Sequence, residues 1–251
     1  MTGAMLSRSN TTGNDSPRYA APPHWQRTSV SALLAGSPRQ ELSPRQLGLL
    51  STVLGDDKGG VFVSGDVTLL KGRCISIVGA RKVSREGAAR ARRLARELAS
   101  AGVAIVSGLA AGVDAEAMTA AIGAGGHVVG VIGTPLDKAY PAQNKRLQEE
   151  VYRDHLLISQ FASGSRVFPS NFPERNRLMA LLSDATVVIE ASDTSGSLHQ
   201  AAECQRLGRW LFIARSVADD PALKWPKKFL AHQRCQVLDS TPALLATVYG
   251  Q

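Results

Sequence analysis

The sequence predicts a doubly wound, mostly parallel α/β sheet with helices on both faces, and two features of the chain carry this prediction. From Val61 onward, short β-branched segments alternate with Ala-rich helical stretches. The strand-like segments are largely apolar and several end in glycine, a pattern typical of parallel strands buried on both faces. Strict alternation implies right-handed crossovers, and ligands of such sheets bind at the carboxyl ends of the strands.

Three regions are expected along the chain. Residues 1–38 are rich in Ser, Thr, Gly, Pro and Asn and predict a disordered basic tail. Residues 39–60 predict a short helical segment, in which Ser43 caps a helix over 43–54. Residues 61–251 predict the α/β domain. Its strands are expected at 61–65, 74–79, 103–108, 127–133, 155–161, 185–191 and 209–215, and its helices at 85–101, 112–124, 142–153, 173–182 and 196–207.

Composition narrows the class of protein. The chain has 251 residues, of which 44% are hydrophobic, and a formal net charge of +8. It therefore has enough apolar residues for a core, and its charge favours polyanionic partners. We expect a cytoplasmic protein without a membrane span, because no apolar run reaches about 18 residues and no apolar signal segment precedes the domain. Cys74, Cys204 and Cys235 form no C-x-x-C pair, so we expect neither a metal site nor a disulfide framework.

The loops after the second and third predicted strands carry the first candidate binding residues. Gly79 permits close approach of a ligand to the backbone, and Arg81 offers a planar fork suited to phosphate. Ser107 and Gly108 form a small turn that leaves room for a ligand or for close packing of helix on strand. Asp114 falls in the first turn of the next helix, where it equally fits a stabilising role toward the helix dipole.

Two further loops resemble anion sites. Gly133 ends a predicted strand, and the loop that follows carries Lys138. The stretch Ser195, Gly196 and Ser197 leads into the last predicted helix, where hydroxyls and backbone N–H groups can hold an anion. Plain capping of that helix by a serine is the alternative.

The predicted helix 173–182 opens with Arg175, Asn176 and Arg177. Two guanidinium groups and an amide near a helix start form a candidate phosphate clamp, although Glu174 partly offsets their charge. A solvated helix start is the alternative. Because these residues are expected in a polar loop, truncation of either arginine should weaken binding and leave the core intact.

Together these blocks resemble the DprA/Smf family, over roughly residues 61–240. The matching runs are SIVGAR, SGLAAGVDAEA, IGTPLDKAYPAQN, FPERNRLMALLS and VVIEASDTSGSL. The resemblance implies a Rossmann-like fold, a homodimer, and a basic pocket that binds single-stranded DNA onto which a RecA-type recombinase is loaded, in DNA uptake, repair or phage defence. Position by position, it implies a pocket made of Gly79, Arg81, Ser107, Gly108, Asp114, Gly133, Lys138, Arg175, Asn176, Arg177, Ser195, Gly196 and Ser197.

The chain departs from the family pattern at several positions. Ala111 and Glu174 stand where the family commonly has a basic residue. The last predicted strand runs into Ala214 and Arg215, where the family usually has a Pro-Gly turn. Residues 216–251 are too few for the winged-helix domain of some members, because domains rarely fall below about 50 residues.

We expect no catalytic residue and no cofactor, and two alternatives to DNA binding remain open. The first is a sensor or binder of a nucleotide-derived ligand, which shares every pocket feature. The second is a nucleotide phosphoribohydrolase similar to the Lonely-guy family. The segment ASDTSGSLHQAAE lacks the double glycine of that family's P-G-G-x-G-T-x-x-E loop and has His199, Gln200 and Ala201 where its Glu is expected.

For DNA, stacking on Tyr140, Phe168 or Phe172 would add about 1–3 kcal/mol per base.

Overall fold

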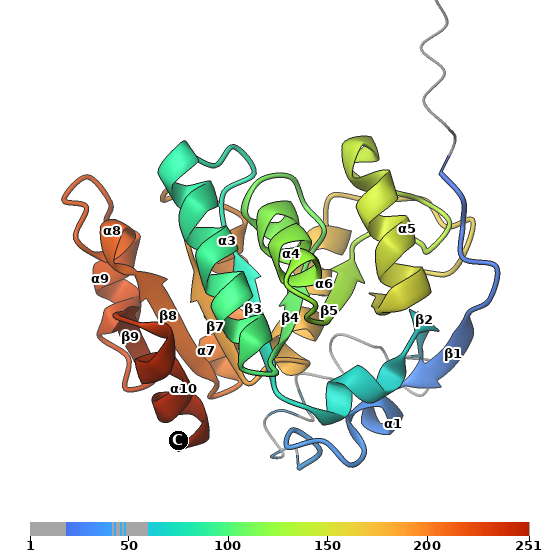
Figure 1. Ribbon diagram of the computed structural model, residues 1–251, viewed down its shortest axis with the longest axis horizontal. Coiled ribbons are helices and arrows are strands. Elements are labelled where there is room, and N and C mark those ends of the chain that lie inside the picture. Colours follow the sequence, from blue (N-terminus) through green and yellow to red (C-terminus); the bar gives the residue numbers. More distant parts are fainter. Residues whose placement is uncertain (1–18, 42, 44–45, 47, 49–59, 251) are drawn as a thin grey trace, which may run out of the picture.

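The computed structural model describes residues 19–41, 43, 46, 48 and 60–250 (Figure 1). Within them, one nine-stranded sheet has the order β1-β2-β6-β5-β4-β3-β7-β8-β9. The strands are β1 Gln26–Ser29, β2 Gly60–Gly65, β3 Cys74–Val78, β4 Ala104–Ser107, β5 Val128–Ile132, β6 Leu156–Ser159, β7 Ala185–Val188, β8 Trp210–Ala214 and β9 Cys235–Leu238. The helices are α1 Val30–Leu34, α3 Arg85–Ser100, α4 Val113–Gly123, α5 Lys145–Asp154, α6 Asn171–Leu181, α7 Ser197–Arg206, α8 Arg215–Ala218, α9 Trp225–Leu230 and α10 Thr241–Tyr249, with short 3-10 turns η1 Val67–Lys71 and η2 Ala142–Asn144.

The sheet confirms the predicted fold class. All strand pairs from β6 across to β9 are parallel, whereas β1 and β2 add to the edge in antiparallel pairs. In β3, Ile75 and Ile77 pack toward α3, α4, α5 and α10, while Cys74 and Val78 pack toward α1, α6, α7, α8 and α9. This alternation gives the sheet two apolar faces, and helices cover both (Figure 1).

The structure differs from the prediction of a disordered tail over residues 19–38. β1 pairs with β2, and the next helix, α1, buries Val30, Leu33 and Leu34 against the core. The sequence of β1, QRTS, is polar because its side chains lie at an exposed sheet edge, so no apolar alternation marks it. The tail after β8 likewise forms α8, α9, β9 and α10 and extends the sheet.

The predicted helix at 43–54 lies mostly outside the described residues. Its start is visible, because the Ser43 hydroxyl accepts a hydrogen bond from the Gln46 N–H, and the Gln46 side chain accepts one from the Ser43 N–H. Such reciprocal bonding is a capping box. None of the described helices combines the length and the hydropathy that a membrane span requires.

A buried arginine fastens the N-terminal segment to the sheet. Arg39 is fully buried, and its Nη1 lies 2.7 Å from Asp184 Oδ1. Its Nη2 donates to the carbonyls of Leu70 and Gly72. The second oxygen of Asp184 accepts from the Cys74 N–H and the Tyr249 hydroxyl, each at 2.9 Å. One ion pair therefore joins the segment before β2, the start of β3 and the last helix.

We expect Arg39→Ala to lower the free energy of unfolding by about 3–5 kcal/mol, because it leaves the buried Asp184 carboxylate and two carbonyls without their donor. Urea denaturation followed by circular dichroism measures this change. Arg153→Ala is the control, because Arg153 forms an exposed ion pair with its neighbour Asp154 and its removal should leave the midpoint unchanged. Equal midpoints for the two variants would contradict the assigned role of Arg39.

Candidate nucleic-acid interface

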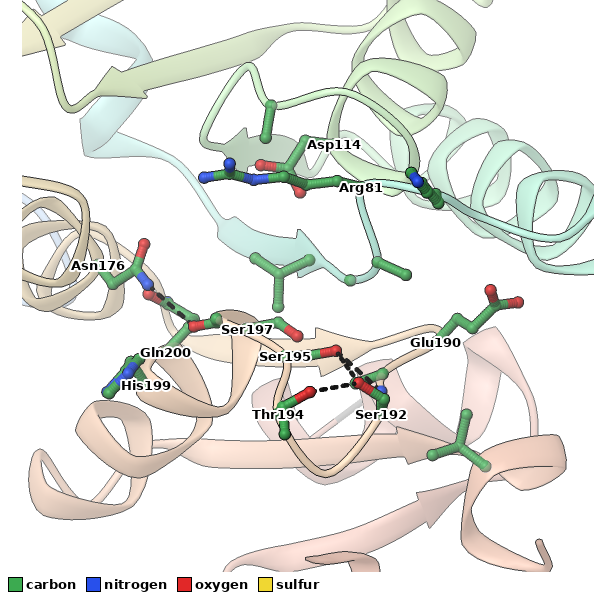
Figure 2. Close-up of a pocket in the computed structure, with 18 of the residues that line it drawn as sticks. Arg81, Asp114, Asn176, Glu190, Ser192, Thr194, Ser195, Ser197, His199 and Gln200 are labelled. Atoms are coloured by element: carbon green, nitrogen blue, oxygen red, sulfur yellow. Dashed lines mark hydrogen bonds between the residues drawn. The ribbon is translucent and has the colours of Figure 1, made fainter. Parts of the chain in front are cut away.

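A cavity of about 820 Å³ opens at the carboxyl ends of β3 and β7. The turn after β3, the start of α4, the middle of α6 and the segment before α7 form its walls. Figure 2 shows Arg81 and Asp114 on one side of the cavity and Ser192, Thr194 and Ser195 on the opposite side. This is the edge at which ligands of parallel sheets bind.

The turn after β3 brings one exposed arginine to the cavity. A Cβ at Gly79 would lie 2.6 Å from the Val113 side chain and 2.8 Å from the Glu190 carbonyl, so only glycine fits there. The next residue, Ala80, donates its N–H to that carbonyl at 2.7 Å. Arg81 is exposed and lies over the Phe172 ring, 5.6 Å from its centroid. Its fork is available to a ligand, since no carboxylate among the described residues pairs with it.

The loop after β4 is held by buried hydrogen bonds. The Ser107 hydroxyl donates to the Ile77 carbonyl at 2.7 Å inside the sheet and does not line the cavity. Asp114 accepts from the Gly108 N–H at 3.0 Å. Burial raises the pKa of the Asp114 carboxyl, although Arg175 and the Gly108 N–H act in the opposite direction. Asp114 therefore fixes the conformation of the loop after β4 through its buried hydrogen bond to the Gly108 N–H.

Arg175 is buried, which corrects the expectation that it lies in an open polar loop. α6 begins at Asn171, two residues before the predicted start, so Arg175 lies in its second turn. Its Nη1 donates to the carbonyls of Gly108 and Val131, each at 2.6 Å, and a Cβ on Gly108 would lie 2.1 Å from the same atom. Burial lowers the pKa of Arg175. The guanidinium joins the ends of β4 and β5 and forms part of the cavity wall.

Two of the predicted cations lie outside the cavity. Arg177 pairs with Glu203 of α7 at 3.3 Å, so it faces the neighbouring helix. Lys138 is exposed and donates to the Ser165 carbonyl at 3.1 Å. The third member of the predicted clamp, Asn176, does line the cavity, and its amide lies 3.4 Å from the Gly196 carbonyl. The structure therefore does not bring the three together as a clamp.

The turn before α7 offers hydroxyls and a helix start to the cavity. The Ser192 N–H donates to the Ser195 hydroxyl at 2.8 Å, which closes the turn. Ser197 is the first residue of α7 and is 9% exposed, and its buried hydroxyl has no hydrogen-bond partner among the described residues. A buried hydroxyl without a partner at a helix N-terminus is suited to receive an anionic ligand.

A second, smaller cavity of about 120 Å³ lies beside the first and shares Arg81 and Arg175 with it. A Cβ at Gly133 would lie 2.8 Å from the Phe172 ring, so glycine permits that ring to reach the strand end. Tyr140 is 49% exposed, and its ring centroid lies 5.3 Å from that of Phe172. Tyr140, Phe172 and Arg81 thus form a row of flat groups along the rim.

The prediction missed several residues that line the cavity, among them Lys82, Glu190 and Thr194. Glu190 accepts from the N–H and the hydroxyl of Ser84 and so anchors the start of α3. A signal for it was present, because Glu190 is the only charged residue in the predicted strand 185–191. Among the described residues, no cluster of three or more His, Cys, Asp or Glu side chains is arranged to hold a metal ion.

Comparison with known proteins identifies the family. A family model described as DNA recombination-mediator protein A matches residues 51–248. The chain belongs to this family. DNA processing protein DprA of Streptococcus pneumoniae is 39% identical over 160 residues, which are 63% of this chain and 56% of that protein. DNA processing protein DprA of Bacillus subtilis is 35% identical over 176 residues, 70% of this chain and 59% of that protein. The chain thus spans little more than half the length of these DprA relatives.

Solved structures of the DprA family have the same fold. DNA processing protein A of Streptococcus pneumoniae matches with a TM-score of 0.73 and 30% identity, over 90% of this chain and 75% of that one. DNA processing protein A of Helicobacter pylori matches with a TM-score of 0.71 and 24% identity, over 90% of this chain and 96% of that one. These matches confirm the Rossmann-like sheet.

The two arginines of the predicted clamp should respond differently to truncation. Arg175→Ala removes the donor from two buried carbonyls and the cation beside Asp114, so we expect a loss of about 3–5 kcal/mol in unfolding free energy. Arg177→Ala breaks a partly exposed pair and should cost less than about 1 kcal/mol. Chemical denaturation of both variants measures the difference. Similar losses in the two would show that Arg175 has no special part in the fold.

Proposed function

We propose that the chain binds single-stranded DNA without sequence preference and acts as a recombination mediator of the DprA type. The observation that carries the proposal is the cavity, which has an exposed arginine on one wall and the start of α7 on the other. The net charge of +8 supports a polyanionic ligand. The family description names a DNA recombination mediator, and the structurally similar DNA processing protein A of Helicobacter pylori binds single-stranded DNA.

Phosphate groups would bind between the two walls. Arg81 supplies a fork that matches phosphate oxygens, and Lys82 adds a second exposed cation next to it. From the other side, the Ser197 hydroxyl and the backbone N–H groups at the start of α7 complete the anion site. Gly79, Ser195, Gly196 and Asn176 line the same space.

Bases would stack on the rings of Tyr140, Phe168 and Phe172, which we call the aromatic rim. Tyr140 and Phe168 are about half exposed, and Phe168 lies under Arg166, whose guanidinium is 5.4 Å from the ring centroid. Stacking accepts every base and adds about 1–3 kcal/mol per base, which suits binding without sequence preference. Lys138 is exposed and donates to the carbonyl of Ser165, which directly precedes Arg166. It would contact the DNA strand outside the cavity.

The remaining predicted residues would act by shaping the site. Arg175 joins the ends of β4 and β5 through the Gly108 and Val131 carbonyls, Asp114 holds the Gly108 N–H, and Ser107 ties β4 to β3 through the Ile77 carbonyl. Gly133 makes room for the Phe172 ring. Arg177 takes no part in this proposal, because it faces Glu203. We further propose that the chain works as a homodimer in the cytoplasm and hands DNA to a RecA-type recombinase; the description of the family as a DNA recombination mediator supports the recombination role.

A nucleotide-derived ligand is the second candidate, because a cavity of about 820 Å³ is also the size of a small-molecule site. A competition titration separates the two candidates. A mononucleotide that displaces a labelled oligonucleotide at equal molar concentration would favour the nucleotide ligand. DNA binding predicts that many contacts along the strand make the oligonucleotide far tighter.

Single-stranded DNA should bind more tightly than duplex of equal length, and the affinity should fall steeply with salt. Each phosphate that the protein neutralises on a single strand contributes a slope of about −0.7 in log K against log salt. Arg81→Ala should therefore weaken binding and make the slope shallower by about 0.7, because one phosphate is no longer neutralised. Fluorescence anisotropy over a salt series measures both quantities. A slope near zero in the unaltered protein would rule out phosphate recognition.

The chain should neither release the base from AMP nor cut labelled single strands in the presence of magnesium. Glycosidic cleavage needs a carboxylate free to act beside the ribose. The Glu190 carboxylate is occupied by Ser84 and lies 3.8 Å from Arg90, and Asp114 is buried against the Gly108 N–H. Product detection by chromatography tests this. Turnover above background that disappears in Glu190→Gln would favour the phosphoribohydrolase.

A further inference from the structure

A second large hollow lies on the α3 side of the sheet. It is a groove of about 950 Å³ between α3 and α10, over the ends of β7, β8 and β9. Figure 1 shows α3 and α10 on the same face of the sheet. The floor is apolar, with Leu94, Ile189 and Leu238, and four arginines and two carboxylates line the walls. None of the residues assigned above to phosphate or base contacts lines this groove.

The groove and the cavity meet at Arg90, a residue that lines both. The nearest carboxylate oxygen to its guanidinium belongs to Glu190 and is 3.8 Å away, and Arg90 has no hydrogen bond among the described residues. Its Nε is buried without a partner. A guanidinium with unused donors, placed where two hollows join, is suited to an anion that passes from one to the other.

Arg90 begins a row of cations along α3. Arg93 and Arg96 follow at intervals of three residues and line the groove, so the row extends over about 9 Å at 1.5 Å per residue. That length corresponds to two or three nucleotides of a stacked strand, which rises about 3.4 Å per nucleotide along its axis. Arg96 is exposed and pairs with no described carboxylate, and Arg93 lies 3.7 Å from Glu97 in an exposed pair.

The opposite wall offers one more cation. Arg215, at the start of α8, lies 2.9 Å from Asp239 in a pair whose two side chains are more than half exposed. Exposed ion pairs contribute little to stability, so phosphate groups can compete for these arginines. Four arginines against two carboxylates leave the groove with an excess of positive charge. The groove therefore fits an anionic chain.

We infer that a DNA strand bound in the cavity continues past Arg90 into the α3–α10 groove, which holds its backbone by phosphate contacts to Arg93, Arg96 and Arg215. This inference rests on the proposed DNA binding. The groove joins the cavity at Arg90, so a strand bound in the cavity can extend directly into the groove, and this continuity favours nucleic acid over an acidic polypeptide. The groove then sets how many nucleotides each protein molecule covers.

The experiment compares two oligodeoxythymidylates, of about 4 and about 16 nucleotides, which span the range of single-strand site sizes. Arg93→Glu/Arg96→Glu alters the groove alone. Lys71→Glu/Arg153→Glu is the matched control, with the same change in charge on two exposed side chains that line neither hollow. Circular dichroism verifies that each variant is folded, and Arg93→Gln/Arg96→Gln repeats the test without charge reversal.

The unaltered protein should bind the long oligonucleotide more tightly than the short one. The groove variant should lose about tenfold or more in affinity for the long oligonucleotide and stay within about twofold for the short one. Its salt slope for the long oligonucleotide should be shallower by about 0.7 for each phosphate that the groove no longer neutralises. The control variant should show neither difference.

Two outcomes would overturn the inference. In the first, the oligonucleotides bind and Arg81→Ala weakens them, but the groove variant titrates like the control, so DNA stays within the cavity. In the second, labelled poly-glutamate binds the unaltered protein and not the groove variant, while the long oligonucleotide is unaffected, so the groove serves an acidic polypeptide. If the unaltered protein binds neither oligonucleotide, DNA binding itself is refuted.

Discussion

The arrangement of the site depends on one buried guanidinium. Arg175 donates to the carbonyls of Gly108, which directly follows β4, and of Val131, near the end of β5, and it lies beside the buried Asp114. Asp114 in turn holds the Gly108 N–H. A charge so deeply buried is costly unless its donors are used, and here the acceptors are backbone atoms at the ends of β4 and β5, beside the cavity. The two strand ends are thereby held together before any ligand arrives.

This arrangement separates the residues that build the site from those exposed to a ligand. Glycines at 79 and 108 are required because a Cβ would meet backbone or the Arg175 guanidinium. Arg81 and Lys82 remain exposed at the cavity. Few cations are therefore available within the cavity itself, and a polyanion that gains affinity mainly from charge needs further contacts beyond it. The arginines of the α3–α10 groove are placed to supply them.

The central strands and helices were predictable from sequence because each is an apolar run or an amphipathic stretch bounded by glycine or polar residues. β3, β4 and β5 begin and end within one residue of their expected bounds. The edge elements were not predictable in this way. β1 is polar, and β9 is a four-residue strand in a segment without clear periodicity. Their places come from pairing with neighbours, which a single sequence does not reveal.

For the candidate site, several of the residues named from sequence line the cavity, but the direction of each side chain was not predictable. Gly79, Arg81, Asp114, Asn176 and the serines before α7 do line the cavity. Arg175 and Arg177 are two residues apart on one helix and read alike in sequence, yet one is buried beneath the loops and the other pairs with Glu203. The difference arises because α6 begins two residues earlier than predicted and because the partners of the two arginines lie far away in the sequence. Arg175 finds its acceptors at the ends of β4 and β5, and Arg177 finds Glu203 on α7.

The Arg39–Asp184 pair bears on where the folding unit begins. The match to the family model starts at residue 51, but Arg39 precedes that point and fills a buried site made by Leu70, Gly72 and Asp184. A fragment cut at the family boundary would leave an unneutralised carboxylate beneath the sheet and uncover the apolar surface that α1 protects. Expression of this domain by itself therefore requires the segment from β1 to Arg39 as well, although no residue of that segment lines the cavity.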